Sequence, residues 1–536
     1  SNSFCTLLAF EAMGVRSVLA SCKLALFLVV FLVVHFVAHV IDRTLILGLR
    51  KLSGLSTQCI GWPPPWLFDS AVRPHRRSTK ESVVDIHVQN AANAHSWFGW
   101  PIVVPRSSAD ENPLGHPDEA QSHLVHGKNA AVGLNAPVYT NHLSTIMANF
   151  KPVPHIVYRR EIAKSYDGCD LAVDWAYPED NTHLFSGPIV AAMEMLAGVG
   201  RALGVIDETF TRFGIPPQHG QGDTRSAAHN HVGVLSILPG LLSESWTTYI
   251  RSFVRVALSH GFVVAMVHTR GIATPLTRPK IFHGGFTEDV RHWTYTYLSR
   301  EALAKRFGRP TNAVLVGFSL GANVLGNFLA EDGDEVRRRS AVVTASAVSA
   351  PWRFHDVAVP MARWIQKMTY DADFKGGLVY YLKYNAAVLR DPKTGAGVGF
   401  DYERGLRIKD VPEFDEHVMV PHHGYRDRDH YYTEVSCFQR LHKVTLPLVC
   451  VGVADDPICG PPPKSDHWAE LCARTPSLAY AELPSGGHLG CLGHPMAELT
   501  LQPTPIEALV CRSMAHFLVN LSHGTTMDKP LHSDRQ

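Results

Sequence analysis

A Gly-x-Ser-x-Gly pentapeptide between an apolar run and a helix-forming run constrains this chain more than any other stretch. Residues 312–316 form a mainly apolar run that contains the β-branched residues Val314 and Val316, as in a buried strand, and residues 320–330 favour a helix. Gly317 and Gly321 allow strand and helix to approach closely, which holds Ser319 on a strained turn with its hydroxyl exposed. A serine hydroxyl is a weak nucleophile until a base takes its proton. The motif therefore predicts a histidine and a carboxylate later in the chain.

An acidic pair and a histidine follow later apolar runs in the required order. Asp455 and Asp456 come directly after the run 446–453, and His488 lies in a glycine-rich loop after the run 478–483. A carboxylate at the C-terminal end of a sheet strand is where the acid of a catalytic triad belongs. Taken singly, the acids could cap a turn and the histidine could be a surface residue. Together they predict a triad in the α/β-hydrolase order. Asp456 is preferred over Asp455 because it directly precedes a proline.

Two backbone N–H groups are needed to stabilise the oxyanion of such a reaction. One is predicted at Leu320, directly after the nucleophile. The other is predicted at Leu241, in the loop Pro239-Gly240-Leu241 that follows the apolar run 232–238. The alternative for that loop is an ordinary strand-to-helix turn. No metal ion and no organic cofactor are expected.

The alternation of apolar runs and helical stretches from residue 232 onward predicts an α/β fold with a mostly parallel sheet. The predicted domain covers residues 135–520, with strands that include 153–159 and 171–175 and a single long helix at 287–307. Two segments interrupt the alternation: an insertion at 178–230, helical in its first part, and a cap over the site at about 352–415. A polar tail occupies residues 521–536.

The N-terminal part predicts a membrane anchor followed by a linker. Residues 24–41 are apolar except for His35 and His39, and the stretch 44–49 could extend the span, so that residues 1–60 hold one transmembrane helix. A cleavable signal peptide and a buried helix are the alternatives. Positive charge on both sides leaves the orientation undecided. Residues 61–134 are expected to be a Pro/Asn/His-rich linker with one short element at 83–88.

Composition adds two expectations, and two local groups of polar residues add two more. The net charge of +1 gives no reason to expect a nucleic-acid partner. The ten cysteines are scattered without a C-x-x-C pair, which fits neither a disulfide framework nor a zinc site. His283 and Asp289 are expected to bond structurally before a helix capped by Thr287. The group around His422 and His423 is expected to be a solvated loop, not a metal site.

Several segments resemble, in order, the motifs of a known family: residues 141–146 (N-H-L-S-T-I, with Ser144 where the family has Gln), 166–175 (D-G…D-W), 268–271, 283–289, 317–323, 384–385, 414–415, 431–432 and 455–457. The family is the AB hydrolase 4 group of α/β-hydrolases, which includes membrane-anchored esterases and lipases and the yeast medium-chain ethyl-ester synthases. The resemblance covers about residues 136–519. Pro239 stands where many relatives have His.

The resemblance and the residues together suggest a membrane-anchored serine hydrolase that cleaves esters of lipid-like, short- or medium-chain acyl groups through Ser319, His488 and Asp456. Two alternatives stay open. The same acyl-enzyme could pass its acyl group to an alcohol and so form esters, or the chain could be a non-catalytic ligand-binding protein with a hydrolase fold. No obligatory protein partner is evident from the sequence.

Overall fold

A computed structural model describes residues 82–87, 127–132, 141–149, 151, 153–186, 190–193, 195–197, 231–391, 398–483, 485–492, 498 and 500–522. The predicted membrane span at 24–41 lies outside these ranges. Inside them, no helix combines the length and the apolar character needed to cross a bilayer.

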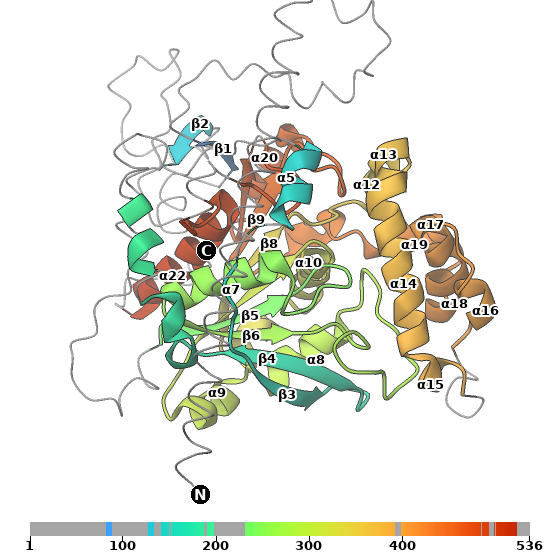
Figure 1. Ribbon diagram of the computed structural model, residues 1–536, viewed down its shortest axis with the longest axis horizontal. Helices are drawn as coiled ribbons and strands as arrows, with labels where there is room; N and C mark the ends of the chain where they lie inside the picture. Colours follow the sequence, from blue (N-terminus) through green and yellow to red (C-terminus); the bar gives the residue numbers. More distant parts are fainter. Residues whose placement is uncertain are drawn as a thin grey trace, which may run out of the picture.

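One ten-stranded sheet organises the described residues, in the order β2-β1-β10-β9-β8-β7-β5-β6-β4-β3 (Figure 1). The five pairs from β10 to β6 are parallel, and the pairs at the two ends of the sheet are antiparallel. The strands are β1 (Ser82–His87), β2 (Gly127–Val132), β3 (Arg159–Lys164), β4 (Asp170–Ala176), β5 (Gly233–Leu238), β6 (Phe262–Val267), β7 (Ala313–Phe318), β8 (Val342–Val348), β9 (Leu448–Val453) and β10 (Leu478–Leu483).

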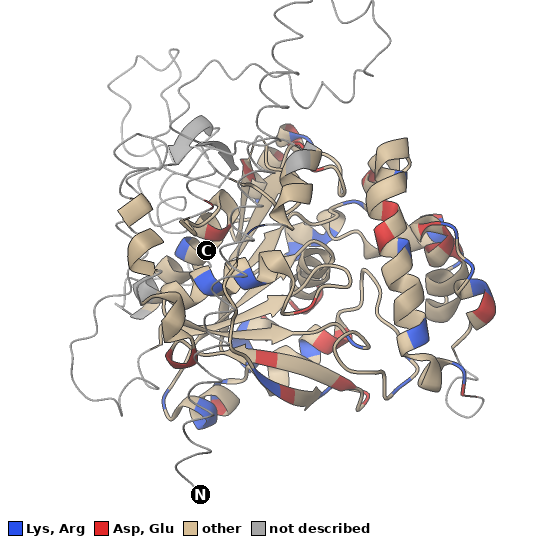
Figure 2. Cartoon of the chain, viewed as in Figure 1, with Lys and Arg blue, Asp and Glu red and all other residues tan. Residues whose placement is uncertain are grey.

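The central strands form because their sequences are apolar on both sides. Every residue of β5, β6, β7 and β9 is buried. Figure 2 shows no Lys, Arg, Asp or Glu on these strands, in contrast to the charged edge strand β3. Strands with continuous apolar runs need cover on both faces, and helices supply it here.

Two groups of helices cover the two faces of the sheet. One core joins the sheet to α7 (Thr248–Ser259) and α22 (Pro505–Ser522). The other joins it to α8 (Glu288–Thr296), α9 (Arg300–Phe307), α10 (Leu320–Asp332), α11 (Glu335–Arg339), η7 (Phe438–Lys443) and α20 (Ser465–Arg474). The predicted single helix 287–307 is wrong, because the chain breaks at Ser299, whose side chain accepts the Ala302 N–H and starts α9.

The cap is a helical lobe beside the sheet with a core of its own (Figure 1). It consists of α12 (Phe354–Met361), α13 (Trp364–Gln366), the π-helical turn η5 (Lys367–Asp371), α14 (Ala372–Tyr384), α15 (Ala386–Leu389), α16 (Tyr402–Gly405), α17 (Val411–Phe414), the π-helical turn η6 (Asp415–Met419), α18 (Val420–His423) and α19 (Arg428–Val435). The helices therefore continue to Val435, well past the expected end of the cap at 415.

Two boundaries at the start of the domain differ from expectation. The sheet does not begin after residue 135: β1 pairs with β10, and β2 pairs with β1, so part of the expected linker belongs to the domain. The first hairpin strand is β3, at residues 159–164 and not 153–159. Residues 153–158 precede it without regular structure, and a helix, α5 (Asn141–Ala148), comes before them. In the insertion 178–230, the described part has a 3-10 helix, η2 (Glu179–Leu184), and helical residues at 190–193 and 195–197.

Three of the segments that resemble family motifs, 166–175, 268–271 and 283–289, meet at one buried arginine. Arg270 is 1% exposed. Its guanidinium bonds to Asp167 in the hairpin turn (Nη1 to Oδ2, 2.9 Å) and to Asp289 in α8 (Nε to Oδ2, 2.7 Å). Asp289 is therefore structural, as expected. Thr287 does precede α8, but its hydroxyl donates to Glu331 (2.6 Å) and caps no helix N–H. Loss of one partner of a buried ion pair costs about 3–5 kcal/mol, so this cluster fixes the loops around the site.

Candidate active site

The turn that carries Ser319 is strained and closely packed. Ser319 has φ 50° and ψ −119°, between β7 and α10. Such a backbone conformation costs a residue other than glycine about 1–3 kcal/mol. A Cβ atom at Gly321 would lie 2.3 Å from the Leu238 carbonyl oxygen, and one at Gly317 would lie 2.6 Å from the Gly321 oxygen. Both glycines are therefore required for β7, α10 and the loop after β5 to come together.

The structure brings the three predicted triad side chains into one hydrogen-bonded chain. Asp456 Oδ2 lies 2.7 Å from His488 Nδ1. His488 Nε2 lies 3.0 Å from Ser319 Oγ. The His488 and Asp456 side chains are only 9% and 3% exposed. A carboxylate bonded to Nδ1–H leaves the Nε2 lone pair directed at the serine, which is the arrangement that allows an imidazole to take a hydroxyl proton.

The two adjacent aspartates accept hydrogen bonds from different groups. Asp456 Oδ1 accepts the N–H groups of Ile458 (2.8 Å) and Cys459 (2.9 Å), which leaves Oδ2 for His488. Asp455 Oδ1 instead accepts two N–H groups of the histidine loop, from Gly486 (2.9 Å) and Gly487 (2.8 Å). Asp455 thus holds the loop that carries the histidine and makes no hydrogen bond to the imidazole.

Helix α5 is a support of the site that sequence reasoning did not assign. Thr145 Oγ1 accepts the His488 N–H (2.8 Å), and Ser144 Oγ accepts the Leu492 N–H (3.3 Å). A Cβ atom at Gly490 would lie 2.5 Å from the Ser144 carbonyl oxygen. The resemblance of residues 141–146 to a family motif marked this segment, but only the folded chain shows that it fixes the histidine loop.

The loop after β5 passes directly beside the nucleophile. A Cβ atom at Gly240 would lie 3.2 Å from the Ser319 Cβ. The Gly240 N–H donates to the Tyr249 hydroxyl (2.9 Å) and is therefore occupied. The N–H groups of the two predicted oxyanion residues, Leu241 and Leu320, donate to no other backbone group within the described ranges.

The side chains next to this site are apolar and touch the cap. Leu241, Leu242 and Leu320 are partly buried against the cap core. A Cβ atom at Gly377 of α14 would lie 2.3 Å from Leu242 Cδ1, so a larger residue there would collide with the loop. On the other side of the site, Tyr370 of η5 hydrogen-bonds to His142 of α5 (3.0 Å). Leucine side chains next to Ser319 therefore connect the sheet to the cap.

The histidines of the cap do not form a solvated loop, which corrects that expectation. His422 and His423 belong to α18, and the His423 ring lies 4.1 Å from the His283 ring. His422 Nε2 accepts the Ile281 N–H (3.0 Å), and His283 Nδ1 accepts the Gly285 N–H (3.1 Å). Burial lowers the pKa of His283 to about 3 and that of His422 to about 4. These neutral rings join the cap to the loop before α8.

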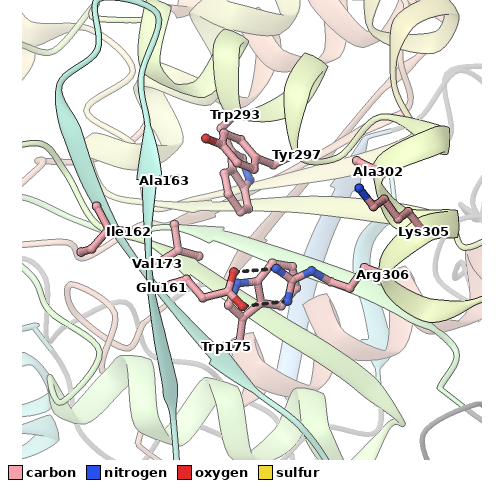
Figure 3. A pocket seen from close by; sticks show the side chains of 10 residues that line it. All are labelled: Glu161, Ile162, Ala163, Val173, Trp175, Trp293, Tyr297, Ala302, Lys305 and Arg306. Atoms are coloured by element: carbon pink, nitrogen blue, oxygen red, sulfur yellow. Dashed lines mark hydrogen bonds and ion pairs between the residues drawn. The ribbon is translucent and has the colours of Figure 1, made fainter.

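A separate cavity of about 490 Å³ lies between the β3–β4 hairpin and helices α8 and α9. Figure 3 shows Arg306 paired with Glu161 across it, beside Trp175. It is lined by Glu161, Ile162, Ala163, Val173, Trp175, Trp293, Tyr297, Ala302, Lys305 and Arg306. None of these is a predicted site residue, so this cavity is distinct from the surroundings of Ser319.

The comparisons place this chain among esterases and lipases by similarity. No protein-family model matches the chain. Three of the curated relatives that it matches each cover about half of it. They are the monoacylglycerol lipase of Saccharomyces cerevisiae (27% identical, 48% of this chain and 54% of the relative), the putative esterase YheT of Escherichia coli K12 (28%, 50% and 73%) and the medium-chain fatty acid ethyl ester synthase/esterase 2 of S. cerevisiae (27%, 48% and 57%). The chain therefore spans between about half and three quarters of the length of these relatives.

A mostly parallel sheet with a serine on a strand–turn–helix, followed along the chain by an acid and a histidine at strand ends, defines an α/β-hydrolase. Together with the relatives, this supports the AB hydrolase family as the group that the chain resembles. The resemblance found in the sequence motifs is confirmed at that level.

Proposed function

We propose that this protein is a serine hydrolase that cleaves carboxylic esters of lipid-like substrates. The observation that carries the proposal is the chain of hydrogen bonds from Asp456 through His488 to Ser319, on a turn whose backbone exposes the serine. Nucleophile, base and orienting acid are the three groups that acyl transfer requires. All three are present, which argues against a non-catalytic ligand-binding protein.

The reaction proceeds by acyl transfer. Ser319 Oγ attacks the ester carbonyl carbon while His488 Nε2 takes the hydroxyl proton, and Asp456 stabilises the imidazolium that forms. The Leu241 and Leu320 N–H groups hold the oxyanion of the tetrahedral intermediate. His488 then gives the proton to the departing alkoxide, which leaves an acyl-enzyme on Ser319. Water, deprotonated by His488, hydrolyses this ester and returns the free serine and a carboxylic acid.

The surroundings favour an acyl group with a substantial apolar part. Leu241, Leu242 and Leu320 border the nucleophile and continue into the cap core. The outer surface of the cap also exposes large apolar side chains: Val359, Trp364, Met368 and Tyr380 are 57–72% exposed. Exposed apolar groups that form one contiguous patch are typical of a surface that meets lipid or a partner. The names of the relatives, a monoacylglycerol lipase and an ethyl ester synthase/esterase, point to the same class of substrate.

A panel of p-nitrophenyl esters and monoacylglycerols of graded chain length tests this proposal. We expect kcat/KM to rise from acetyl to medium-chain acyl groups, because a methylene buried against the leucines contributes about 0.8 kcal/mol. Ser319→Ala is the control for background hydrolysis. A flat or falling dependence on chain length would refute the lipid-like substrate. Absence of hydrolysis across the whole panel would refute the esterase.

The same acyl-enzyme can also transfer its acyl group to an alcohol, a second activity favoured by the relative named as an ethyl ester synthase. Adding ethanol or glycerol to the p-nitrophenyl ester assay separates the two outcomes. Ester synthesis predicts that the alkyl ester accumulates at the expense of free acid while release of p-nitrophenol continues. Only free acid at every alcohol concentration would exclude the transferase.

Membrane association through residues 24–41 is part of the proposal. We expect the full chain to stay with membranes after high-salt and alkaline carbonate washing, because a single apolar helix of this length is inserted and not surface-bound. A chain shortened to begin at Ser82 keeps both β1 and β2 and is expected to leave the integral fraction while still hydrolysing short esters. Release of the full chain by carbonate would contradict the anchor.

A further inference from the structure

A cysteine lies against the triad, and the triad chemistry makes no use of it. Cys459 follows Asp456 by three residues, and its own N–H donates to Asp456 Oδ1 (2.9 Å). Its thiol lies 3.5 Å from the Ser349 carbonyl oxygen and also interacts with Ser319. Of the seven free cysteines among the described residues, the other six are buried and Cys459 alone is partly exposed. The cysteine that is partly exposed is thus the one beside the nucleophile.

Three different donor atoms converge at this point. A carboxylate oxygen of Asp456, the Cys459 sulfur and a ring nitrogen of His488 all lie within 4.8 Å of one another. No other group of three or more such residues in the described part of the chain has this geometry. A tetrahedral zinc site has bonds of about 2.0–2.3 Å, which places its ligand atoms roughly 3.3–3.8 Å apart. Asp456 Oδ2 and His488 Nδ1, which lie 2.7 Å apart, would have to separate slightly to admit the ion.

We propose that Asp456, Cys459 and His488 form an inhibitory site for Zn²⁺ or Cd²⁺, which shuts off the proposed hydrolase by occupying its general base. The inhibitory effect rests on the proposed function, whereas the metal site itself does not. The ion is a ligand that blocks the reaction and not a cofactor for it.

The donor set decides which ions fit. Thiolate and imidazole select zinc and softer metals, whereas Mg²⁺ and Ca²⁺ prefer sites made wholly of oxygen ligands. Binding is balanced by proton release: the neutral Cys459 thiol loses its proton to solvent as the metal–sulfur bond forms, and the neutral imidazole supplies a lone pair without losing a proton. Metal affinity therefore rises with pH.

Binding at His488 Nδ1 stops catalysis. An ion shared by Nδ1 and Asp456 replaces the 2.7 Å hydrogen bond between the two side chains. The imidazole then carries its proton on Nε2, which faces Ser319, and can no longer act as general base. Chelation restores the free imidazole, so the inhibition is reversible.

Titration of the full chain with Cd²⁺ tests the site without any substrate, since a Cd²⁺–thiolate bond gives an ultraviolet charge-transfer band. We expect this band in the wild type and in Ser319→Ala, which keeps all three ligands but lacks the nucleophile. Cys459→Ser should lose the band. Asp455→Asn, which changes the neighbouring carboxylate, should keep it. A wild type without the band, or a Cys459→Ser variant that retains it, would overturn the site.

Ester hydrolysis with Zn²⁺ tests the inhibitory role, each variant being compared with its own metal-free rate. We expect Zn²⁺ to inhibit the wild type reversibly, with EDTA restoring activity, and Mg²⁺ to have no effect. Cys459→Ser should need at least about tenfold more Zn²⁺ for half-inhibition. Equal inhibition of both forms would overturn the proposal.

If Cys459→Ser is poorly folded, His488→Gln replaces it in the Cd²⁺ titration and should weaken binding similarly. A band in Ser319→Ala without esterase activity in the wild type would refute the function but keep the site.

Discussion

Replacement of Ser319 by alanine is expected to abolish fluorophosphonate labelling and to lower kcat/KM for ester hydrolysis by at least about 10³-fold. The reason is geometric. The hydroxyl stands on a turn with φ 50°, 3.0 Å from His488 Nε2. Alanine leaves the base and the oxyanion N–H groups in place but removes the atom that forms the acyl-enzyme. Labelling followed by mass spectrometry of the modified peptide measures the effect directly.

Ser349 offers a matched control. It also has positive φ (47°), and it lies directly after β8, the neighbour of β7 in the sheet. Its hydroxyl is buried without a hydrogen-bond partner among the described residues. Ser349→Ala should therefore keep the label on Ser319. Full labelling of Ser319→Ala would show that another residue is the nucleophile.

The sequence predicted the parts of the fold that depend on local pattern. Strands β5 to β10 are recognisable because each is a short apolar run, and the Ser319 turn is recognisable because only glycine fits at Gly317 and Gly321. The order of serine, acid and histidine then placed three distant side chains at one edge of the sheet. Parallel strands deliver their carboxyl ends to the same edge, so this step needed no structure.

The parts that could not be predicted depend on contacts between distant segments. The Thr145 hydroxyl supports His488 from 343 residues away, and β1 pairs with β10 although they are the first and the last strands along the described chain. Neither contact leaves a periodic pattern in the sequence. From the sequence, the histidines of α18 were predicted to be polar loop residues, because histidine is often exposed. Only the contact of His423 with His283 and the lowered pKa of His422 show that these rings are partly buried and neutral.

Asp456→Asn is expected to lower kcat/KM by on the order of 10³–10⁴-fold, far more than Asp455→Asn. In Asp456→Asn the side-chain carbonyl still accepts the Ile458 and Cys459 N–H groups, so the amide nitrogen faces His488. That nitrogen is a donor and needs an acceptor at Nδ1. The imidazole then carries its proton on Nε2, where it points at Ser319 and cannot take the hydroxyl proton. The variant is expected to fold normally and to lose the reaction.

Asp455→Asn is the matched comparison because the two residues are adjacent, both 6% exposed, and both accept backbone N–H groups. In Asp455→Asn the side-chain carbonyl oxygen can still accept the Gly486 and Gly487 N–H groups, so the histidine loop keeps its support and activity should fall by less than about tenfold. Steady-state kinetics and the rate of fluorophosphonate labelling, with melting temperatures as a check on folding, distinguish the two variants. The reverse ranking would transfer the role of the acid to Asp455, and equal losses would mean that the loop, not the tautomer, limits catalysis.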